Sequence, residues 1–273
     1  MVAGGGRLSR LVHPTAVVDP QAEIGPGTRI GPYCIIEGPV HIGPDNEVLA
    51  HSVILGRVRI GTRNRIGPHA CIGTPPQSIG RFPEDTGVEI GDRNVIREFA
   101  TVHRALDPAR PTRIGNDNFV MSGGHVAHDC VVGSGCVLTN GAFVSGHCEI
   151  GDRVNISSPV GVHQFVRIGT LAILSAGAQV GMDVPPYMLV EGRNTVRGLN
   201  LVGMKRAGIG PEARRQIKHV FRVLYRSGLT LSQALERLEA EDLRPEARRI
   251  VDFCRAPSRR GIMRGDRGGG GAD

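Results

Sequence analysis

The sequence predicts a mainly β protein, in which a parallel β-helix of six-residue repeats is followed by a small α-helical domain. Two observations lead to this fold. Aliphatic residues recur at every sixth position over most of the chain, and aromatic residues make up only 4% of a sequence that is 40% hydrophobic. The core must therefore be built from Val, Ile, Leu and Ala, and the fixed short period indicates stacked repeats.

The repeat runs from Val12 to Val180 in one frame of six. Its first hexads read VHPTAV, VDPQAE, IGPGTR and IGPYCI, and its last read IGTLAI and LSAGAQ. Three hexads make one triangular coil, and each hexad supplies a short parallel strand and a corner. The aliphatic first residue points inward, and the fifth residue is small because it also turns inward. Stacked coils bury a continuous aliphatic core and pair their backbone groups.

Two Pro- and Gly-rich insertions, residues 74–87 and 105–112, interrupt the repeat without shifting its frame. We expect both to leave the coil as loops, because loops on a rigid scaffold commonly carry binding residues. The fifth positions of other hexads hold four of the six cysteines: Cys34, Cys130, Cys136 and Cys148. We interpret these cysteines as small core residues without a redox role.

The repeat pattern sets the expected domain organisation. The β-helix is predicted over residues 12–190 and ends in an extended segment, Asp183–Tyr187. A helical domain is expected over residues 191–264. The Gly-rich tail, residues 265–273, is predicted to be disordered.

Three helical patterns lie in the second domain. Pro211 begins a helix that runs to about Ser227, where Gly228 ends it. Thr230 and Gln233 then form a capping box for the next helix. A third apolar pattern lies near Pro245–Arg255.

Composition limits the class of protein. The formal net charge of +7 favours an acidic partner, which could be nucleic acid, anionic lipid or an acidic protein. No apolar stretch approaches the roughly 20 residues that a membrane-spanning helix needs. The first residues lack the apolar run of a signal peptide. We therefore expect a cytoplasmic protein without an integral membrane segment, in which the cysteines stay reduced.

Four histidines of the later coils are candidates for chemistry: His125, His128, His147 and His163. A coil of three hexads stacks Gly146 directly on His128, about 4.8 Å away at the spacing of paired strands. His147 is the neighbour of that glycine, and His125 lies on the same edge as His128. The spacing therefore predicts a line of imidazoles along one edge of the coil.

Three interpretations of this line remain open from spacing alone. His128, with Asp129 beside it, could act as a general base, while the Gly146 N–H donates to an oxyanion. Three imidazoles could instead hold zinc, as in the carbonic anhydrases of this architecture. The histidines could also be exposed polar residues at strand corners.

The segment HVAHDC at residues 125–130 carries a specific resemblance, and further motifs extend it over nearly the whole chain. These are IGDRN at 90–94, VHQF at 162–165, DVPPY at 183–187 and YRSG at 225–228. The chain resembles the UDP-N-acetylglucosamine O-acyltransferases that begin lipid A synthesis. This resemblance implies a left-handed β-helix, since periodicity alone does not give the hand. It also implies a homotrimer with its sites between subunits, no cofactor and no metal.

The resemblance implies a role for each matching residue. His128 falls on the catalytic base, Asp129 on its partner and Gly146 on the oxyanion donor. Other residues match positions that contact the acyl donor, the sugar or the nucleotide: Gln77, His125, His147, His163, Gln164, Asn200 and Arg206. Ala176 takes the position that limits acyl length, where its methyl group favours a medium chain. Acyl carrier protein is acidic and would suit a basic stripe four residues apart on one helix face: Arg214, Lys218, Arg222 and Arg226.

Several departures from the family pattern concern the acceptor site. Ser78 and Gly80 stand where the family has Asp and Lys, Val202 replaces a Glu, and Ser158 replaces a Gly. The expected activity is transfer of a 3-hydroxyacyl chain from acyl carrier protein to the 3-hydroxyl of UDP-N-acetylglucosamine. The alternatives are N-acylation of a 3-amino sugar nucleotide, a zinc-dependent hydratase and a non-catalytic scaffold. Neither nucleic acid nor membrane is an expected partner.

Overall fold

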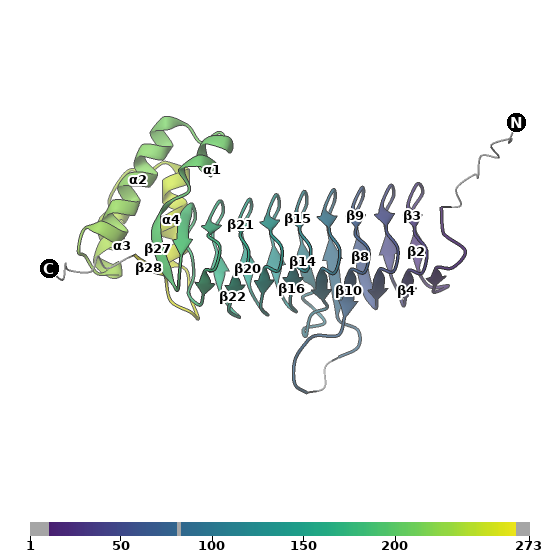
Figure 1. Cartoon of the computed structure of the whole chain (residues 1–273). Coiled ribbons are helices and arrows are strands. Elements are labelled where there is room, and N and C mark those ends of the chain that lie inside the picture. Colours follow the sequence, from purple (N-terminus) through teal and green to yellow (C-terminus); the bar gives the residue numbers. More distant parts are fainter. Residues whose placement is uncertain (1–10, 81–82, 266–273) are drawn as a thin grey trace, which may run out of the picture.

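The computed structural model describes residues 11–80 and 83–265, and this part of the chain forms a left-handed parallel β-helix with helices at its C-terminal end (Figure 1). The predicted fold class is confirmed. Three parallel sheets make the three sides of the coil. Their strands are two to five residues long, because each hexad must turn a corner before the next side begins.

The first side, sheet B, has nine strands: β1 Val17–Val18, β4 Ile35–Glu37, β7 Val53–Leu55, β10 Cys71–Thr74, β13 Thr101–His103, β16 His125–Val126, β19 Phe143–Val144, β22 Gly161–Val162 and β25 Gln179–Val180. The second, sheet C, has eight: β2 Glu23–Ile24, β5 His41–Ile42, β8 Arg57–Ile60, β11 Gly87–Ile90, β14 Thr112–Ile114, β17 Val131–Val132, β20 Glu149–Ile150 and β23 Arg167–Ile168.

The third side, sheet A, has eleven strands: β3 Arg29–Ile30, β6 Glu47–Val48, β9 Arg65–Ile66, β12 Val95–Ile96, β15 Phe119–Val120, β18 Val137–Leu138, β21 Asn155–Ile156, β24 Ile173–Leu174, β26 Met188–Glu191, β27 Thr195–Leu199 and β28 Arg264–Gly265. All pairs in the three sheets are parallel except β26 with β27, which form an antiparallel hairpin.

The register of the sheets explains how the frame survives the insertions. Elsewhere within the hexad repeat, paired residues lie 18 apart, as for the bond from the Asn64 amide to Asn46. The separation is 30 across the first insertion, between Asn94 and Asn64, and 24 across the second, between Thr101 and His125. Each insertion therefore adds a whole number of hexads, and the aliphatic first residues of the hexads that follow stay buried.

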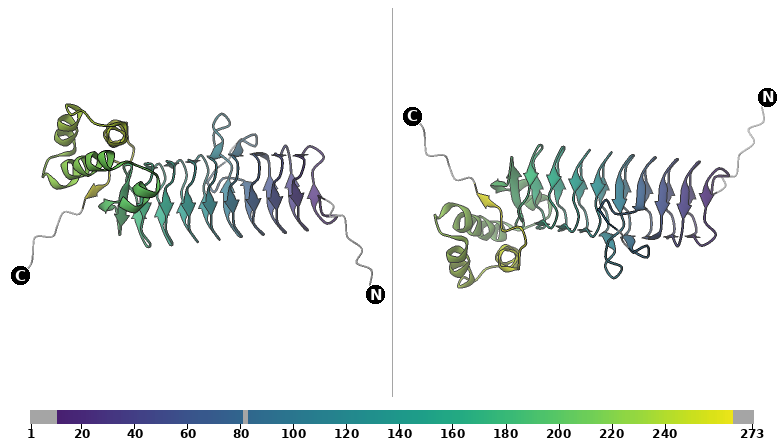
Figure 2. Two further views of the ribbon diagram at one scale, coloured as in Figure 1. Left: turned by 90° about the horizontal axis from the view of Figure 1, so that it is seen from above. Right: turned by 90° about the horizontal axis from the view of Figure 1, so that it is seen from below.

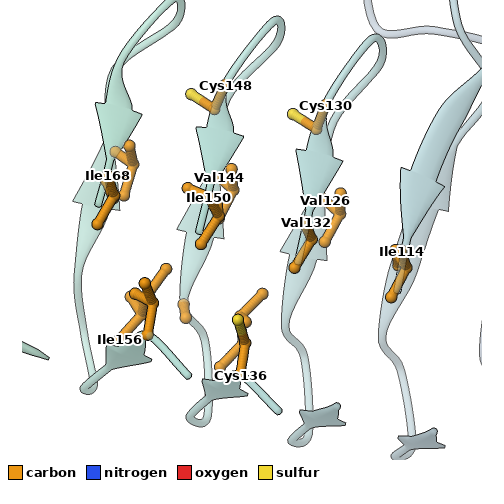
Figure 3. Close-up of a cluster of buried hydrophobic side chains, with 14 of the residues drawn as sticks. Ile114, Val126, Cys130, Val132, Cys136, Val144, Cys148, Ile150, Ile156 and Ile168 are labelled. Carbon is orange, nitrogen blue, oxygen red and sulfur yellow. The ribbon is translucent and has the colours of Figure 1, made fainter. Parts of the chain in front are cut away.

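The core is a column of the same aliphatic positions repeated from coil to coil. Figure 3 shows this for Ile114, Val132, Ile150 and Ile168 of sheet C, with Val126 and Val144 of sheet B facing them. Cys130 and Cys148 fill the corner beside them. All six cysteines are free, and Cys34, Cys130, Cys136 and Cys148 are fully buried, so their interpretation as core residues is confirmed.

One corner contains buried asparagines at the fifth position of the hexad, which the expectation of small residues there did not predict. Asn46, Asn64, Asn94 and Asn118 stack at the corner between sheets C and A. The side-chain oxygen of each accepts a bond from the backbone N–H of the next, at 2.7 to 2.9 Å. Their amide NH2 groups donate to carbonyl or side-chain oxygens of the same stack. The ladder thus satisfies backbone groups at a corner where strands cannot pair.

The C-terminal part begins as strand, which corrects the expected domain organisation. Of residues 191–199, expected in the helical domain, Glu191 ends β26 and Thr195–Leu199 form β27. β26 pairs with β24 as a further layer of sheet A. Gly265 was expected in the disordered tail, but it lies in β28 and pairs with Val196 of β27. Strand pairing with the end of the coil outweighs the flexibility of glycine there. The remainder of that tail, residues 266–273, lies outside the described residues.

Four helices complete the described chain: α1 Leu201–Arg206, α2 Pro211–Arg226, α3 Leu231–Glu239 and α4 Pro245–Arg255. Gly228 adopts a φ of 77° just after α2, and the Thr230–Gln233 capping box begins α3, as predicted. The short helix α1 was not predicted. Both views in Figure 2 show the helices gathered at one end of the coil. Within the described residues, no helix is long and apolar enough to cross a membrane.

Candidate active site

The candidate site lies at the corner between sheets B and C, where the chain leaves β16 and enters β17. Asp129 has a φ of 58°, which turns its side chain back beside His128. The Nδ1 atom of His128 lies 2.7 Å from the Asp129 Oδ2. The two side chains are 12% and 7% exposed, so the pair is largely shielded from water. A hydrogen bond of this kind fixes the imidazole ring and directs its Nε2 away from Asp129.

The second insertion holds Asp129 in place. The N–H groups of Leu106 and Asp107 donate to its carboxylate at 3.0 to 3.2 Å, and the Thr112 hydroxyl accepts from its backbone N–H at 2.9 Å. Burial acts to raise the pKa of Asp129, but the bonds from His128 and from these two amides keep that pKa below its usual value. Asp129 is therefore a fixed anion beside His128.

Gly146 lies directly on the imidazole of His128, as the spacing of one coil predicts. A Cβ atom at Gly146 would come within 2.5 Å of His128 Cε1 and 2.7 Å of Nε2. The backbone register supports the same stacking, because the His147 N–H donates to the His128 carbonyl at 3.0 Å. Only glycine leaves room for the ring in this position.

The amide of Gly146 is also free to bind a ligand. It occupies the third position of its hexad, where earlier coils have Pro14, Pro20, Pro26 and Pro32. Proline fits there because the N–H at this position is not needed for strand pairing. Among the described residues, no acceptor is found for the Gly146 N–H. A proton acceptor and an unused amide donor therefore lie side by side.

Two further histidines surround this pair. His147 packs edge-on against His128, with ring centres 5.1 Å apart, and its Nε2 lies 3.7 Å from the Asp129 carboxylate. His125 bonds to the Thr101 hydroxyl at 2.7 Å and packs edge-on against His103 at 5.1 Å. Burial, helped by the nearby His103 and His128, lowers the pKa of His125 to about 4. His125 is therefore neutral at physiological pH.

A further histidine, His103, lies beside this group and was not among the predicted site residues. It lies on β13, one coil before His125, and its Nδ1 bonds to the Pro75 carbonyl of the first insertion at 2.8 Å. Burial, with a contribution from His128, lowers its pKa as well. The second insertion hid this neighbour, because it lies between His103 and His125 and makes paired residues 24 apart there.

Other predicted site residues lie elsewhere on the described chain. Gln164 and His163 are exposed one coil beyond Gly146, and Gln77 is exposed on the first insertion. Ala176 is exposed at a different corner, between sheets A and B. Asn200 caps α1, where its Oδ1 accepts from the Gly203 N–H at 2.8 Å while its amide donates to the Leu171 carbonyl. Arg206 lies in the last turn of α1.

The predicted basic stripe lies on α2 at the end of the coil. Lys218, Arg222 and Arg226 are exposed, and Arg214 is half-buried. Of the described residues, only His128, Asp129 and His147 form a group that could hold a metal ion, with ligand atoms within 4.8 Å of one another. An ion there would compete with the His128–Asp129 hydrogen bond, because Nδ1 already uses its lone pair or proton in that bond.

Comparison with known proteins decides the family. Residues 183–263 match the family model described as UDP N-acetylglucosamine O-acyltransferase, domain 2, and residues 39–74 match the bacterial transferase hexapeptide model. A protein of Janthinobacterium sp. (strain Marseille), named acyl-acyl-carrier-protein–UDP-N-acetylglucosamine O-acyltransferase, is 42% identical over 261 residues, covering 93% of this chain and 99% of that protein. This chain belongs to the UDP-N-acetylglucosamine O-acyltransferase family. It is an acyltransferase, and the resemblance seen in its motifs is confirmed.

Other members agree with this assignment. The identically named protein of Anaeromyxobacter dehalogenans is 44% identical over 256 residues, covering 93% of this chain and 99% of that protein. The crystal structure of the UDP-N-acetylglucosamine acyltransferase from Bacteroides fragilis has a TM-score of 0.88 at 40% identity and covers 92% of this chain and 99% of that one. The second-domain model begins at residue 183, eight residues before our expected boundary at 191.

Proposed function

We propose that this acyltransferase moves a 3-hydroxyacyl chain from acyl carrier protein to the 3-hydroxyl of UDP-N-acetylglucosamine, as the first step of lipid A synthesis. The observation that supports this most directly is the position of Gly146 on the His128 ring. The relatives' names supply the two substrates. His128 is the general base in this proposal, Asp129 its partner and the Gly146 amide the oxyanion donor.

The reaction follows from these three groups. The sugar hydroxyl loses its proton to His128 Nε2 as its oxygen attacks the thioester carbonyl carbon. The carbonyl oxygen becomes an oxyanion, which accepts a hydrogen bond from the Gly146 N–H. The carbon–sulfur bond then breaks, and the imidazolium returns the proton to the thiolate of the carrier arm. The Asp129 carboxylate stabilises the imidazolium in between, since its low pKa keeps it charged.

The remaining predicted residues have places in the same proposal. His125, His147, His163, Gln164 and Gln77 surround the acyl donor and the sugar, with Asn200 and Arg206 at the nucleotide and Ala176 at the end of the acyl chain. Several of these lie far from His128 within one subunit. A homotrimer with sites between subunits would bring a neighbour's residues to the pair. The basic stripe of α2 would dock the acidic carrier, and the enzyme would work in the cytoplasm.

The acceptor is the least constrained part of the proposal. Val202 is 59% exposed on α1, and Ser78 and Gly80 are exposed on the first insertion, so three charges typical of the family are absent. The same base and amide donor would also serve an amine in place of a hydroxyl. N-acylation of a 3-amino sugar nucleotide is therefore the alternative that these departures favour.

Mass spectrometry of the products tests the proposed function. The enzyme is supplied with UDP-N-acetylglucosamine, its 3-amino analogue and a mixture of 3-hydroxyacyl carrier proteins of different length. We expect one dominant product, the 3-O-acyl ester carrying a medium-length chain. A dominant amide would establish the alternative acceptor. No acylated nucleotide sugar from either acceptor would contradict the proposal.

A further inference from the structure

A groove of about 750 Å³ lies beside the candidate active site. One wall consists of outward-facing residues of sheet C, from β14 to β23. The second insertion and the segment 257–259, which follows α4, contribute the other walls. Asp129 and His147 both line this groove, so it reaches the Asp129 side of the His128–Asp129 pair. The C-terminal segment thus reaches back to the catalytic corner of its own subunit.

Charged groups dominate the groove, and most of them have partners. Its four guanidinium groups belong to Arg110, Arg113, Arg167 and Arg259, and its carboxylates to Asp107, Asp129 and Glu149. Arg113 pairs with Glu89 at 2.9 Å, and Arg167 with Asp183 at 2.7 Å. Arg110 lies 4.0 Å from Asp107 at the exposed rim. Within the described parts of the chain, Arg259 is the groove's arginine without a carboxylate partner.

An aromatic stack fixes the position of Arg259. Its guanidinium carbon lies 4.8 Å from the centre of the Phe165 ring. Phe165 in turn stacks on His147, with ring centres 4.6 Å apart and planes 6° from parallel. His147 and Phe165 have φ values of 59° and 67°, which direct both rings outward from the corner. The rings of Phe165 and His147 therefore connect Arg259 to the Asp129 carboxylate.

This arrangement leaves the guanidinium ready to bind an anion. Stacking uses one face of the group, while its N–H donors lie in the plane and remain available. A planar fork of donors is well matched to phosphate oxygens, and bonds between charged partners are the strong ones. Arg259 is exposed, so a ligand can reach it. Both substrates of the proposed function carry phosphate, either in the phosphodiester of the carrier arm or in the diphosphate of the nucleotide.

We propose that Arg259 binds a substrate phosphate in the groove beside His128 and Asp129, and so positions the reacting group at the catalytic pair. The proposal rests on the proposed function for the identity of the ligands. It adds a residue that the family motifs did not single out. The carboxylates of Glu149 and Asp107 limit where the phosphate can sit, because they repel it from the floor and the rim of the groove.

Binding measurements on the full-length enzyme test this role without requiring turnover. Calorimetry compares 3-hydroxyacyl-phosphopantetheine with the same thioester of pantetheine, which lacks the phosphate, and UDP with uridine. We expect Arg259→Met to weaken one phosphate-containing ligand on the order of 10- to 100-fold and to leave its phosphate-free counterpart unchanged. Which ligand responds tells whether the carrier arm or the nucleotide supplies the phosphate. Arg259→Lys should retain part of the affinity, since it keeps the charge but loses the planar fork.

Arg153→Met is the matched control, because Arg153 is exposed at the corner between sheets C and A, away from the groove. It should bind all four ligands as the wild type does. Equal affinities of Arg259→Met and wild type for both phosphate ligands would overturn the proposal. An equal loss for the ligands with and without phosphate would overturn it as well. If the wild type binds these ligands but forms no product, the proposed function fails while the role of Arg259 stands.

Discussion

At the scale of single residues, the site depends on the absence of a side chain at Gly146. Gly146 has to be small because the His128 ring occupies the volume of its absent side chain. It also has to keep an N–H, which the prolines of equivalent corners do not offer. In the proposed mechanism, one residue therefore positions the base and supplies the donor. Asp129 is the complementary case, a buried carboxylate kept charged by three N–H donors.

Gly146→Ala tests the close packing of this glycine. The new methyl group would lie 2.5 to 2.7 Å from His128 ring atoms and would displace the imidazole. We expect kcat to fall by about 100-fold or more, in line with the loss of geometry at an oxyanion site. Gly198→Ala is the control, because a Cβ there meets no atom within 4 Å. Equal kcat values for the two variants would show that the contact has no catalytic consequence.

Asp129→Asn tests the fixed anion. The amide cannot stabilise an imidazolium and can favour the wrong tautomer of His128, so kcat should fall by about 10³- to 10⁴-fold. The carboxylate has a folded pKa below its unfolded value, so its stabilising effect is present above the unfolded pKa and is lost as pH falls through the folded pKa. Unfolding midpoints measured from neutral to acidic pH should therefore drop less in Asp129→Asn than in the wild type. Parallel pH dependences would contradict this.

At the scale of elements, much of the structure follows from the hexad. The aliphatic first position, the inward fifth position and the frame across both insertions were all readable from the sequence, because the period is exact in residues. The asparagine ladder was not, since Asn is rarely a core residue and its hydrogen bonds appear only once coils are stacked. His103 was missed because the second insertion lies between it and His125. The anchoring of Asp129 was missed because backbone amides, here those of residues 106–107, cannot be recognised from side-chain type.

Asn64→Ala tests the ladder. The change would leave the Asn94 N–H and the Gly91 carbonyl without their buried partner, each at a cost of about 1–3 kcal/mol. We expect the free energy of unfolding to fall by roughly 2–4 kcal/mol in urea titrations. Asn140→Ala at an exposed corner is the control and should change it by less than about 0.5 kcal/mol. A similar small change in both variants would mean that water replaces the ladder.

At the scale of the whole molecule, the coil carries the candidate site, at the corner that follows β16, and the helical end carries α2 with its basic side chains. Figure 1 shows β16 and α2 in these two parts of the molecule. The sequence predicted this division, but it assigned the strand β27 to the helical domain and Gly265 to the tail. Strand pairing explains both differences, because β26, β27 and β28 extend sheet A where no hexad pattern remains. Contacts between distant segments, such as Arg259 on Phe165, also lie beyond any local pattern.

Charge reversal on α2 tests carrier docking. Lys218→Glu should raise the KM for acylated carrier protein about tenfold and reduce its dependence on salt, with the KM for the nucleotide sugar unchanged. The control Arg237→Glu makes the same charge change on α3, outside the stripe. If both variants raise the carrier KM equally, the effect comes from net charge and the stripe is no docking site.

The central claim is that His128 takes the proton of the acceptor at the corner where Gly146 provides the donor. The most direct measurement is the single-turnover rate of acyl transfer from 3-hydroxyacyl carrier protein to UDP-N-acetylglucosamine by the wild type and His128→Ala. We predict a rate lower by about 10³-fold or more in the variant, with an unchanged thermal midpoint. A folded His128→Ala enzyme that transfers the acyl chain at a near-normal rate would contradict the claim.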